Sequence, residues 1–239
     1  LEVCAHNFNR KQGAVRFYEF GKVYGFEGGK YTEESRIGLY MGGEFEADNW
    51  QNKPRPMRYH DLAQQLAQLF EKCALSDVQT EVQDDQILEY GVRFKLRGKE
   101  IGRAGKVKSS LTKDFSIRHD IFYADLDTDL LFQSANPKFD VADIPKFPEV
   151  KRDLSLVLDK RITFAEIRQV VLATEKMLIK EVTAFDIYEG ENIPAGKKSY
   201  SLGFTLLDET KTLTDAEIDT TMNKLMAAFE KKLGAVIRK

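Results

Sequence analysis

The sequence is poor in the residues that most often bind metals or form covalent cross-links. Its 239 residues include two cysteines, three histidines and one tryptophan. Cys4 and Cys73 lie far apart and form no Cys-x-x-Cys pair, so neither a disulfide framework nor a zinc site is indicated. Because Cys73 falls on the apolar stripe of an expected helix, we expect a buried core thiol rather than a reactive one.

Long apolar runs and a large net charge are also absent. No segment is apolar over the roughly 20 residues needed to span a bilayer, and no signal peptide is seen. We therefore expect a cytoplasmic protein with no membrane partner. The formal net charge of −2 argues against a generally basic nucleic-acid coat, so any RNA contact needs a local basic patch. Because the chain begins at Leu1 rather than Met, we expect a fragment of a longer protein.

Motifs for catalysis and metal binding are missing too. The three histidines are widely separated. Cys4-Ala-His6 offers two ligands on one side of a single turn, which are rarely enough to hold a metal ion. The acidic run at 125–129 superficially matches a calcium loop but lacks the required glycine and the terminal bidentate Glu, so we expect a solvated turn. No nucleophile elbow, Walker loop or Gly-x-Gly-x-x-Gly is present. We predict no catalytic and no metal-binding residues.

The first 140 or so residues read as an α+β domain with a mainly antiparallel sheet. Aromatic and β-branched runs, helical periodicity and glycine-broken segments mark its elements. They predict strands at 15–26 and 35–42, a helix at 59–73, short strands within 88–107, a strand at 121–126 and a helical turn at 130–132. The polar segment 133–148 carries three prolines and predicts a linker, with a domain boundary near 140–145.

The remaining residues alternate in the order β-α-β-β-α-β. We predict strands at 154–158, 182–188, 199–207 and 235–238. Two Thr-x-x-Glu capping boxes, Thr163 with Glu166 and Thr214 with Glu217, mark the helix starts. Gly234 can end the second helix in a left-handed conformation. This order predicts a compact open sheet with one free face.

Basic residues flank the strands of this second domain. Lys151 and Arg152 lie near the first strand, Lys197 and Lys198 near the third, and Arg238 ends the last. Since the first and last strands are expected to be neighbours, some of these cations are expected to gather along one edge and contact phosphates. Ordinary solvated side chains are an equally good explanation of the pattern.

The expected free face of the second domain is small and polar. On strand 199–207 the even-numbered residues are apolar, whereas Ser199, Ser201, Gly203 and Thr205 lie on the other face. Such a face lacks the aromatic residues that stack on single-stranded bases. It therefore favours contact with a folded RNA backbone, and Ser199 joins the five basic residues as a predicted RNA-binding position.

Several ordered motifs in residues 145–239 match a known domain. They are Phe147-Pro-Glu-Val-Lys-Arg-Asp-Leu-Ser, Phe185-Asp-Ile-Tyr-Glu-Gly, Gly196-Lys-Lys-Ser and Thr212-Leu-Thr-Asp-Ala-Glu. Together they resemble the ferredoxin-fold anticodon-binding domain that ends the β subunit of bacterial phenylalanyl-tRNA synthetase. The resemblance covers 145–239 as a whole.

Upstream, residues 1–142 resemble the second half of the same subunit's catalytic-like module, truncated at its N-terminus. The similar segments are Asn7-Phe-Asn-Arg10, Arg16-Phe-Tyr-Glu-Phe-Gly-Lys-Val-Tyr, Tyr59-His-Asp-Leu, Ile101-Gly-Arg-Ala-Gly and 121–131. Two segments depart from the family pattern. Leu88-Glu-Tyr-Gly stands where Leu-His-Pro-Gly is usual, and Lys108-Ser109 stands where His-Pro is common.

The resemblance implies a division of labour within the synthetase. The β subunit has a class II synthetase fold without an aminoacylation site, so chemistry with ATP and magnesium belongs to the parent enzyme. No cofactor is expected in this fragment. The implied partners are the anticodon stem-loop of phenylalanine tRNA and the α subunit, in an α2β2 heterotetramer. The implied function is non-catalytic: RNA binding and scaffolding that support attachment of phenylalanine to its tRNA.

Two other functions remain open from the sequence. The chain could be a fragment of a single-chain class II synthetase with its own active site in 1–140, although it lacks the Gly-rich, Arg-ending motif for ATP. It could also be a purely structural subunit-contact module without a role in RNA binding.

Overall fold

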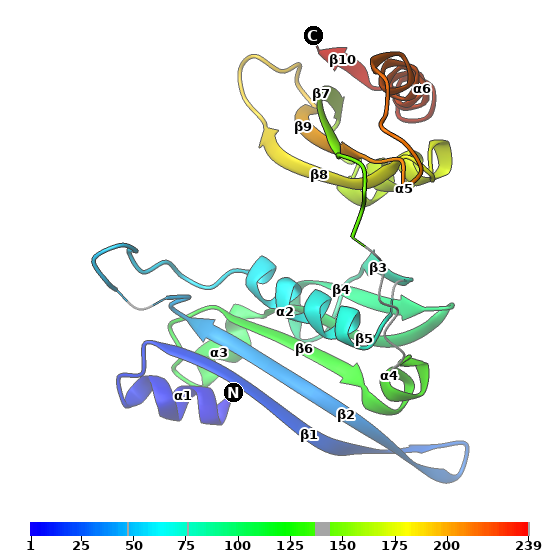
Figure 1. Cartoon of the computed structure of the whole chain (residues 1–239). Helices are drawn as coiled ribbons and strands as arrows, with labels where there is room; N and C mark the ends of the chain where they lie inside the picture. Colours follow the sequence, from blue (N-terminus) through cyan, green and yellow to red (C-terminus); the bar gives the residue numbers. More distant parts are fainter. Residues whose placement is uncertain (47, 76, 137–143, 239) are drawn as a thin grey trace. The chain divides into compact units, whose positions relative to one another are not determined.

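The chain contains two compact units, Leu1–Asp140 and Val141–Lys239 (Figure 1). The computed structural model describes residues 1–46, 48–75, 77–136 and 144–238. Helices combined with antiparallel sheets in both units confirm the predicted α+β class. The expected linker at 133–148 lies partly outside the described residues. None of the described helices has the length and hydrophobicity to span a bilayer.

The first unit is built on a six-stranded antiparallel sheet in the order β1-β2-β6-β5-β4-β3. Its strands are β1 (Ala14–Glu27), β2 (Lys30–Gly43), β3 (Val78–Val82), β4 (Leu88–Leu96), β5 (Lys99–Val107) and β6 (Ile121–Asp127). All except β3 fall in predicted segments. The sequence of β3 shows little apolar alternation because this edge strand pairs only with β4 and is mostly exposed.

Helices cover both faces of this sheet. Helix α2 (Tyr59–Lys72) buries Leu62, Leu66 and Phe70 against one face, as its periodicity predicted. On the other face, α1 (Glu2–Asn9) and α3 (Ser109–Asp114) border a smaller core that contains Cys4, Val15, Leu88, Val107, Ile117 and Ile121. Neither α1 nor α3 was predicted. Both are short, and no side chain caps their N-termini. Helix α4 (Thr128–Ser134) follows β6.

The hairpin β1–β2 extends beyond the rest of the sheet. Each strand has 14 residues, but β6 pairs only with Arg36–Gly42 of β2. The distal half is therefore a two-stranded ribbon. It carries several large exposed side chains, among them Tyr24, Phe26 and Tyr31.

The second unit has the predicted ferredoxin-like order β-α-β-β-α-β. Its elements are β7 (Val150–Asp159), α5 (Phe164–Thr174), β8 (Ile179–Tyr188), β9 (Lys197–Leu206), α6 (Asp215–Leu233) and β10 (Val236–Arg238). The sheet order is β10-β7-β9-β8, and every neighbouring pair is antiparallel. The core lies between one face of the sheet and the two helices. Its fully buried side chains include Leu156, Leu158, Ile167, Leu202, Phe204, Leu225 and Phe229.

Both predicted capping boxes are present. The Thr163 N–H donates to the Glu166 carboxylate at 2.7 Å, and the Thr214 N–H donates to that of Glu217 at 2.9 Å. Gly234 ends α6 with a φ of 61°, a left-handed conformation that glycine adopts without a steric penalty. These local signals fix where the two helices begin and where α6 ends.

Candidate nucleic-acid interface

Among the described residues of the second unit, no helix packs on one face of the four-stranded sheet, and we call this face the open face. Even-numbered residues of β7 and β9, such as Leu156 and Leu202, point into the core beneath α5 and α6. Because side chains alternate along a strand, the odd-numbered residues of β7 and β9 lie on the open face. Residues that lie opposite each other on neighbouring antiparallel strands have their side chains on the same face of the sheet. The strand pairing therefore also shows which residues of β8 and β10 lie on the open face.

Two aromatic side chains stand on the open face at β8. A β-bulge between Ala184 and Asp186 interrupts the alternation, and the Phe185 ring lies over the position of Gly203. Phe185 is 62% exposed, and Tyr188, opposite Ser199, is 43% exposed. The expectation of a face without aromatics was wrong. It considered strand 199–207 alone, whereas the aromatics come from the neighbouring edge strand.

Two glycines leave room for these rings. A Cβ atom at Gly203 would lie 3.7 Å from the Phe185 ring and 3.1 Å from the Thr183 hydroxyl. A Cβ atom at Gly190 would lie only 2.1 Å from the Tyr188 hydroxyl oxygen. A side chain at position 190 would therefore displace the Tyr188 ring, whereas one at position 203 would meet the Phe185 ring at an ordinary contact distance.

Polar groups surround the two rings. Asp186 is exposed and lies opposite Ser201 on the same face, and Ser199, which is 7% exposed, borders Tyr188 in the ladder. Flat exposed rings can stack on bases, while carboxylate and hydroxyl oxygens can accept hydrogen bonds from base edges. The open face thus combines the two kinds of group that single-stranded RNA recognition uses.

The predicted basic residues divide between the two faces. Lys151 and Lys197 have odd numbers and lie on the open face, and Arg238 joins them because it pairs with Ser155. Arg152 points to the helical side, where its guanidinium lies 3.6 Å from the Asp215 carboxylate.

Lys198 also lies on the helical side of the sheet. Its Nζ sits 5.0 Å from the centre of the Tyr200 ring, in a cation–π contact. Neither Lys198 nor Arg152 therefore shares a face with the exposed rings.

The cations of the open face do not form one cluster. Lys151 pairs with Thr205 and Lys197 with Asp159, so they mark opposite ends of the β7–β9 ladder. Eight residue steps at about 3.3 Å each separate the two ends by roughly 26 Å. The expected gathering along one edge is not found. The cations are instead spread along the face, where the same ladder also places the exposed carboxylates of Asp153, Glu181 and Asp186.

Carboxylates near Lys197 are engaged by other cations. The Arg161 guanidinium donates to Asp159 and lowers the pKa of that carboxyl, with help from the Arg161 N–H. Similarly, the hydrogen bond from Lys160 lowers the pKa of Glu189, and the two groups are 2.7 Å apart. Among the described residues no carboxylate lies within 4.0 Å of the Lys197 ammonium, although its charge also helps to lower the pKa of Asp159.

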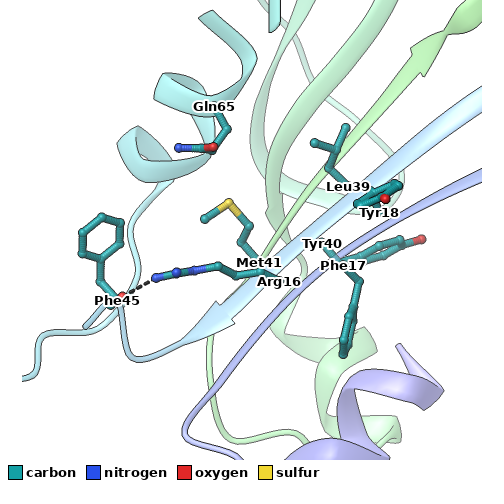
Figure 2. A pocket seen from close by; sticks show the side chains of 8 residues that line it. All are labelled: Arg16, Phe17, Tyr18, Leu39, Tyr40, Met41, Phe45 and Gln65. Atoms are coloured by element: carbon teal, nitrogen blue, oxygen red, sulfur yellow. Dashed lines mark hydrogen bonds between the residues drawn. The ribbon is translucent and has the colours of Figure 1, made fainter. Parts of the chain in front are cut away.

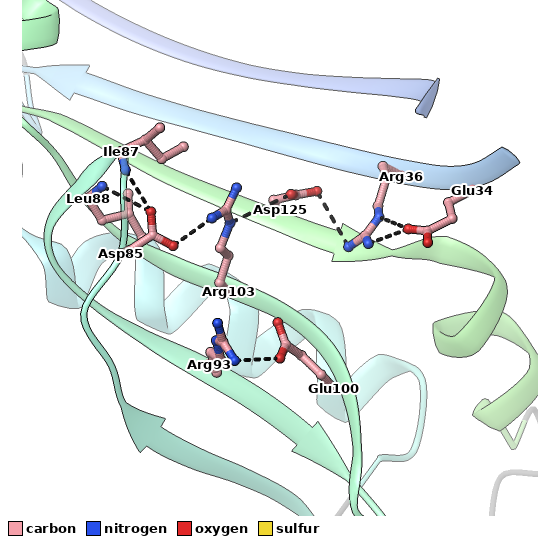
Figure 3. A network of polar contacts seen from close by, with 9 residues as sticks. All are labelled: Glu34, Arg36, Asp85, Ile87, Leu88, Arg93, Glu100, Arg103 and Asp125. Atoms are coloured by element: carbon pink, nitrogen blue, oxygen red, sulfur yellow. Dashed lines mark hydrogen bonds and ion pairs between the residues drawn. The ribbon is translucent and has the colours of Figure 1, made fainter. Parts of the chain in front are cut away.

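In the first unit, a polar network crosses the sheet face opposite α2 (Figure 3). Arg103 lies 2.6 Å from Asp85 and 3.8 Å from Asp125, which also faces Arg36 at 4.0 Å. Burial disfavours ionisation of Asp85. Hydrogen bonds from the Ile87 N–H and from Arg103 outweigh it and lower the pKa of the carboxyl. The charges of this network are thus paired with one another across the strands.

The remaining candidates for chemistry in this unit are also structural. Asp127 caps α4 by accepting from the Leu130 N–H at 2.9 Å, which does not fit a calcium loop. Cys4 is buried whereas His6 is exposed, so the two do not converge. Cys73 is half-buried rather than fully buried, and this partial burial raises the pKa of its thiol. Among the described residues, no group of three or more His, Cys, Asp and Glu side chains could hold a metal ion.

A notch of about 270 Å³ lies between β1, β2 and α2 (Figure 2). Most of its lining is apolar or aromatic, including Leu39 and Met41. Its cation, Arg16, donates a hydrogen bond to the Phe45 carbonyl, and Gln65 lines the notch from α2 (Figure 2). The polar groups of its lining are those of Arg16, Gln65 and the phenols of Tyr18 and Tyr40.

Both units match described families. Residues 145–238 match the ferredoxin-fold anticodon binding domain, and residues 1–128 match the phenylalanyl tRNA synthetase beta chain CLM domain. The chain belongs to the phenylalanyl-tRNA synthetase β-subunit family. Membership agrees with the resemblance of the sequence motifs and favours the β-subunit interpretation over a single-chain synthetase.

Curated relatives in this family carry the name phenylalanine–tRNA ligase beta subunit. The protein of Bacteroides fragilis is 38% identical over 252 residues, covering 100% of this chain and 31% of its own length. That of Legionella pneumophila is 32% identical over 236 residues, covering 98% of this chain and 30% of its own length. The chain thus spans about a third of the length of these β subunits. A solved pyrrolysyl-tRNA synthetase from Desulfitobacterium hafniense aligns over 55% of this chain and 46% of its own at 12% identity, with a TM-score of 0.41, too low to support an argument.

Proposed function

We propose that this chain is a non-catalytic part of a phenylalanyl-tRNA synthetase and that its open face binds the anticodon stem-loop of phenylalanine tRNA. The observation that carries the proposal is the pair of exposed rings, Phe185 and Tyr188, on the helix-free face of the unit that matches an anticodon-binding domain. Exposed aromatic rings that lie together on one face and are bordered by polar groups are typical of an interaction site.

The chemistry of the open face suits unpaired bases of an RNA loop. A base stacked on an aromatic ring gains about 1–3 kcal/mol. Asp186, on the same face, is placed to accept a hydrogen bond from a base amino or imino group. Lys151, Arg238 and Lys197 would then contact phosphates on either side of the stacked bases. This proposal replaces the expectation of pure backbone contact with a combination of stacking and backbone contact.

The same geometry changes the set of proposed RNA-binding residues. Lys151, Lys197 and Arg238 remain, and Ser199 remains as the neighbour of Tyr188. Arg152 and Lys198 point to the helical side and are not expected to reach RNA on the open face.

For the first unit we propose a scaffolding role toward the α subunit, in an α2β2 assembly. Its support is the exposed ribbon of β1–β2, where Tyr18, Phe20, Tyr24 and Phe26 are each more than half exposed and lie on one side of the strand. Large exposed apolar patches mark protein interfaces. ATP and magnesium would then serve the aminoacylation reaction outside this chain.

The RNA-binding proposal is tested by titrating labelled phenylalanine tRNA with the full chain. Saturable binding that the unlabelled anticodon stem-loop displaces is expected. Binding no tighter than to an acidic control protein would instead support the purely structural module. Amino-acid-dependent pyrophosphate exchange should be absent, and its detection would overturn the non-catalytic assignment.

A further inference from the structure

The first unit has a basic cavity of its own, at the ends of α1 and α3. Its volume is about 640 Å³. Phe8 and Asn9 line it from α1, and Lys113, Ser116, Arg118 and His119 line it from the end of α3 and the loop that follows.

The cations of this cavity carry charges that the protein does not neutralise. Within the described residues, Lys113, Arg118 and His119 have no carboxylate within 4.0 Å and make no side-chain hydrogen bond. The neighbouring carboxylate of Asp120 is engaged by Lys106 at 3.0 Å. Elsewhere on this unit, most arginines at the sheet are paired with carboxylates, as Arg103 is with Asp85. The excess positive charge is therefore local to the cavity.

The backbone holds these groups in place. Ile117 is buried at 5% exposure and anchors the loop between its exposed neighbours. Ser116 adopts a φ of 57°, and its N–H donates to the Lys113 carbonyl at 2.8 Å. The His119 ring packs against Phe8 with a centroid distance of 4.6 Å. Two cations, an imidazole and a hydroxyl thus surround one cavity on an ordered loop.

We infer that this cavity binds a phosphate group of an RNA strand. Lysine, arginine and imidazole donors are the side chains that contact phosphates in RNA complexes. All of these donors are exposed, so they fit a phosphate on the surface of a large polyanion better than a small ligand that needs burial. The site is separate from the open face, which belongs to the other unit, and the inference does not depend on that face.

A structural role for these cations is the rival explanation. Positive side chains at helix C-termini offset the partial negative charge of the last carbonyls, and Lys113 lies in the last turn of α3. Under that explanation, removing the charges would lower the melting temperature without changing RNA binding.

The test uses the full chain with the double variant Lys113→Ala/Arg118→Ala. The matched control is Lys53→Ala/Lys99→Ala, which removes two exposed lysines that also lack ion pairs among the described residues and do not line the cavity. For phenylalanine tRNA, the cavity variant should bind several-fold more weakly. Its plot of log affinity against log salt should be less steep by about 1–2. The control should match the wild type. Equal slopes for both double variants would overturn the inference.

If the wild type does not bind tRNA at all, the proposed function is refuted. A second measurement then tests separately whether the cavity binds phosphate. The NMR signals of the His119 ring are followed as inorganic phosphate is added. A shift in the wild type that is lost in the cavity variant supports a phosphate site, and no shift overturns it. A shift combined with an unchanged tRNA slope would assign the cavity to a small phosphate-bearing ligand and overturn the RNA assignment.

Discussion

Tyr188 on β8 lies directly opposite Ser199 on β9, and both side chains belong to the face of the sheet that no helix covers. The pairing fixes an exposed phenol ring beside a small residue, so the ring face is not shielded by its cross-strand neighbour. With Phe185 it supplies two aromatic surfaces on one edge strand. The RNA-binding proposal for this chain follows from that placement.

Replacing Tyr188 with leucine should weaken binding of the phenylalanine tRNA anticodon stem-loop. Losing one stacked base costs about 1–3 kcal/mol, which corresponds to roughly 5- to 150-fold in the dissociation constant. Fluorescence anisotropy with the full chain measures this effect. Tyr31→Leu is the control, because Tyr31 is 87% exposed but lies on the first unit. Equal affinities for Tyr188→Leu and wild type would contradict stacking.

The two faces of the sheet predict opposite results for neighbouring cations. Lys151→Ala and Lys197→Ala should each flatten the salt dependence of tRNA binding by about 0.7–0.9, the loss of one phosphate contact. Arg152→Ala and Lys198→Ala should leave it unchanged, since both side chains point to the helical side. If the second pair changed the slope as much as the first, the open face would not be the site.

Gly190→Ala should impair RNA binding without unfolding the protein. The added Cβ would meet the Tyr188 hydroxyl and displace the far end of that ring, while the backbone there does not require a positive φ. A several-fold loss of affinity with a melting temperature close to that of the wild type is expected. Gly21→Ala, whose Cβ would meet nothing within 4 Å, is the matched control. An unchanged affinity for Gly190→Ala would mean that the position of the Tyr188 ring is unimportant.

The capping box of α6 should make stability depend on acidic pH. Hydrogen bonds from Lys211, and from the N–H and hydroxyl of Thr214, lower the pKa of Glu217 from 4.5 to about 2. A carboxyl whose pKa is depressed by folding stabilises the native state above its unfolded pKa. This contribution is therefore full above pH 4.5 and is lost as the pH falls toward 2.

Melting temperatures of wild type and Glu217→Gln, recorded between pH 2 and pH 7, measure this contribution. The wild type should be the more stable at neutral pH, and the difference should shrink below pH 4.5. A difference that stays constant over the whole range would show that ionisation of Glu217 does not contribute.

Much of the second unit could be predicted from the sequence because its signals are local. The Thr163 and Thr214 capping boxes, Gly234 and the apolar stripes each depend on a few neighbouring residues, and they are confirmed except that α5 ends at Thr174, before Leu178 of the predicted stripe. The short elements α1, β3 and α3 were missed because their apolar periodicity is weak. In addition, helices α1 and α3 have no capping side chain, and the edge strand β3 has a neighbouring strand on one side only.

The composition of the open face was harder to predict. The bulge that places both Phe185 and Tyr188 on that face depends on pairing with β9, which no local pattern reports. One signal was available, however. Arg152 is in phase with Leu154, and Lys198 is in phase with Tyr200, so alternation alone assigns both cations to the apolar face.

We propose above all that the anticodon stem-loop binds the helix-free face of the four-stranded sheet. Backbone amide chemical shifts of the full chain, recorded with and without the phenylalanine tRNA anticodon stem-loop, test it most directly. We expect the largest changes at Thr183, Phe185, Asp186, Tyr188 and Ser201, with little change along α5 and α6. Changes concentrated on the two helices, or no change on β8 at saturating RNA, would contradict it.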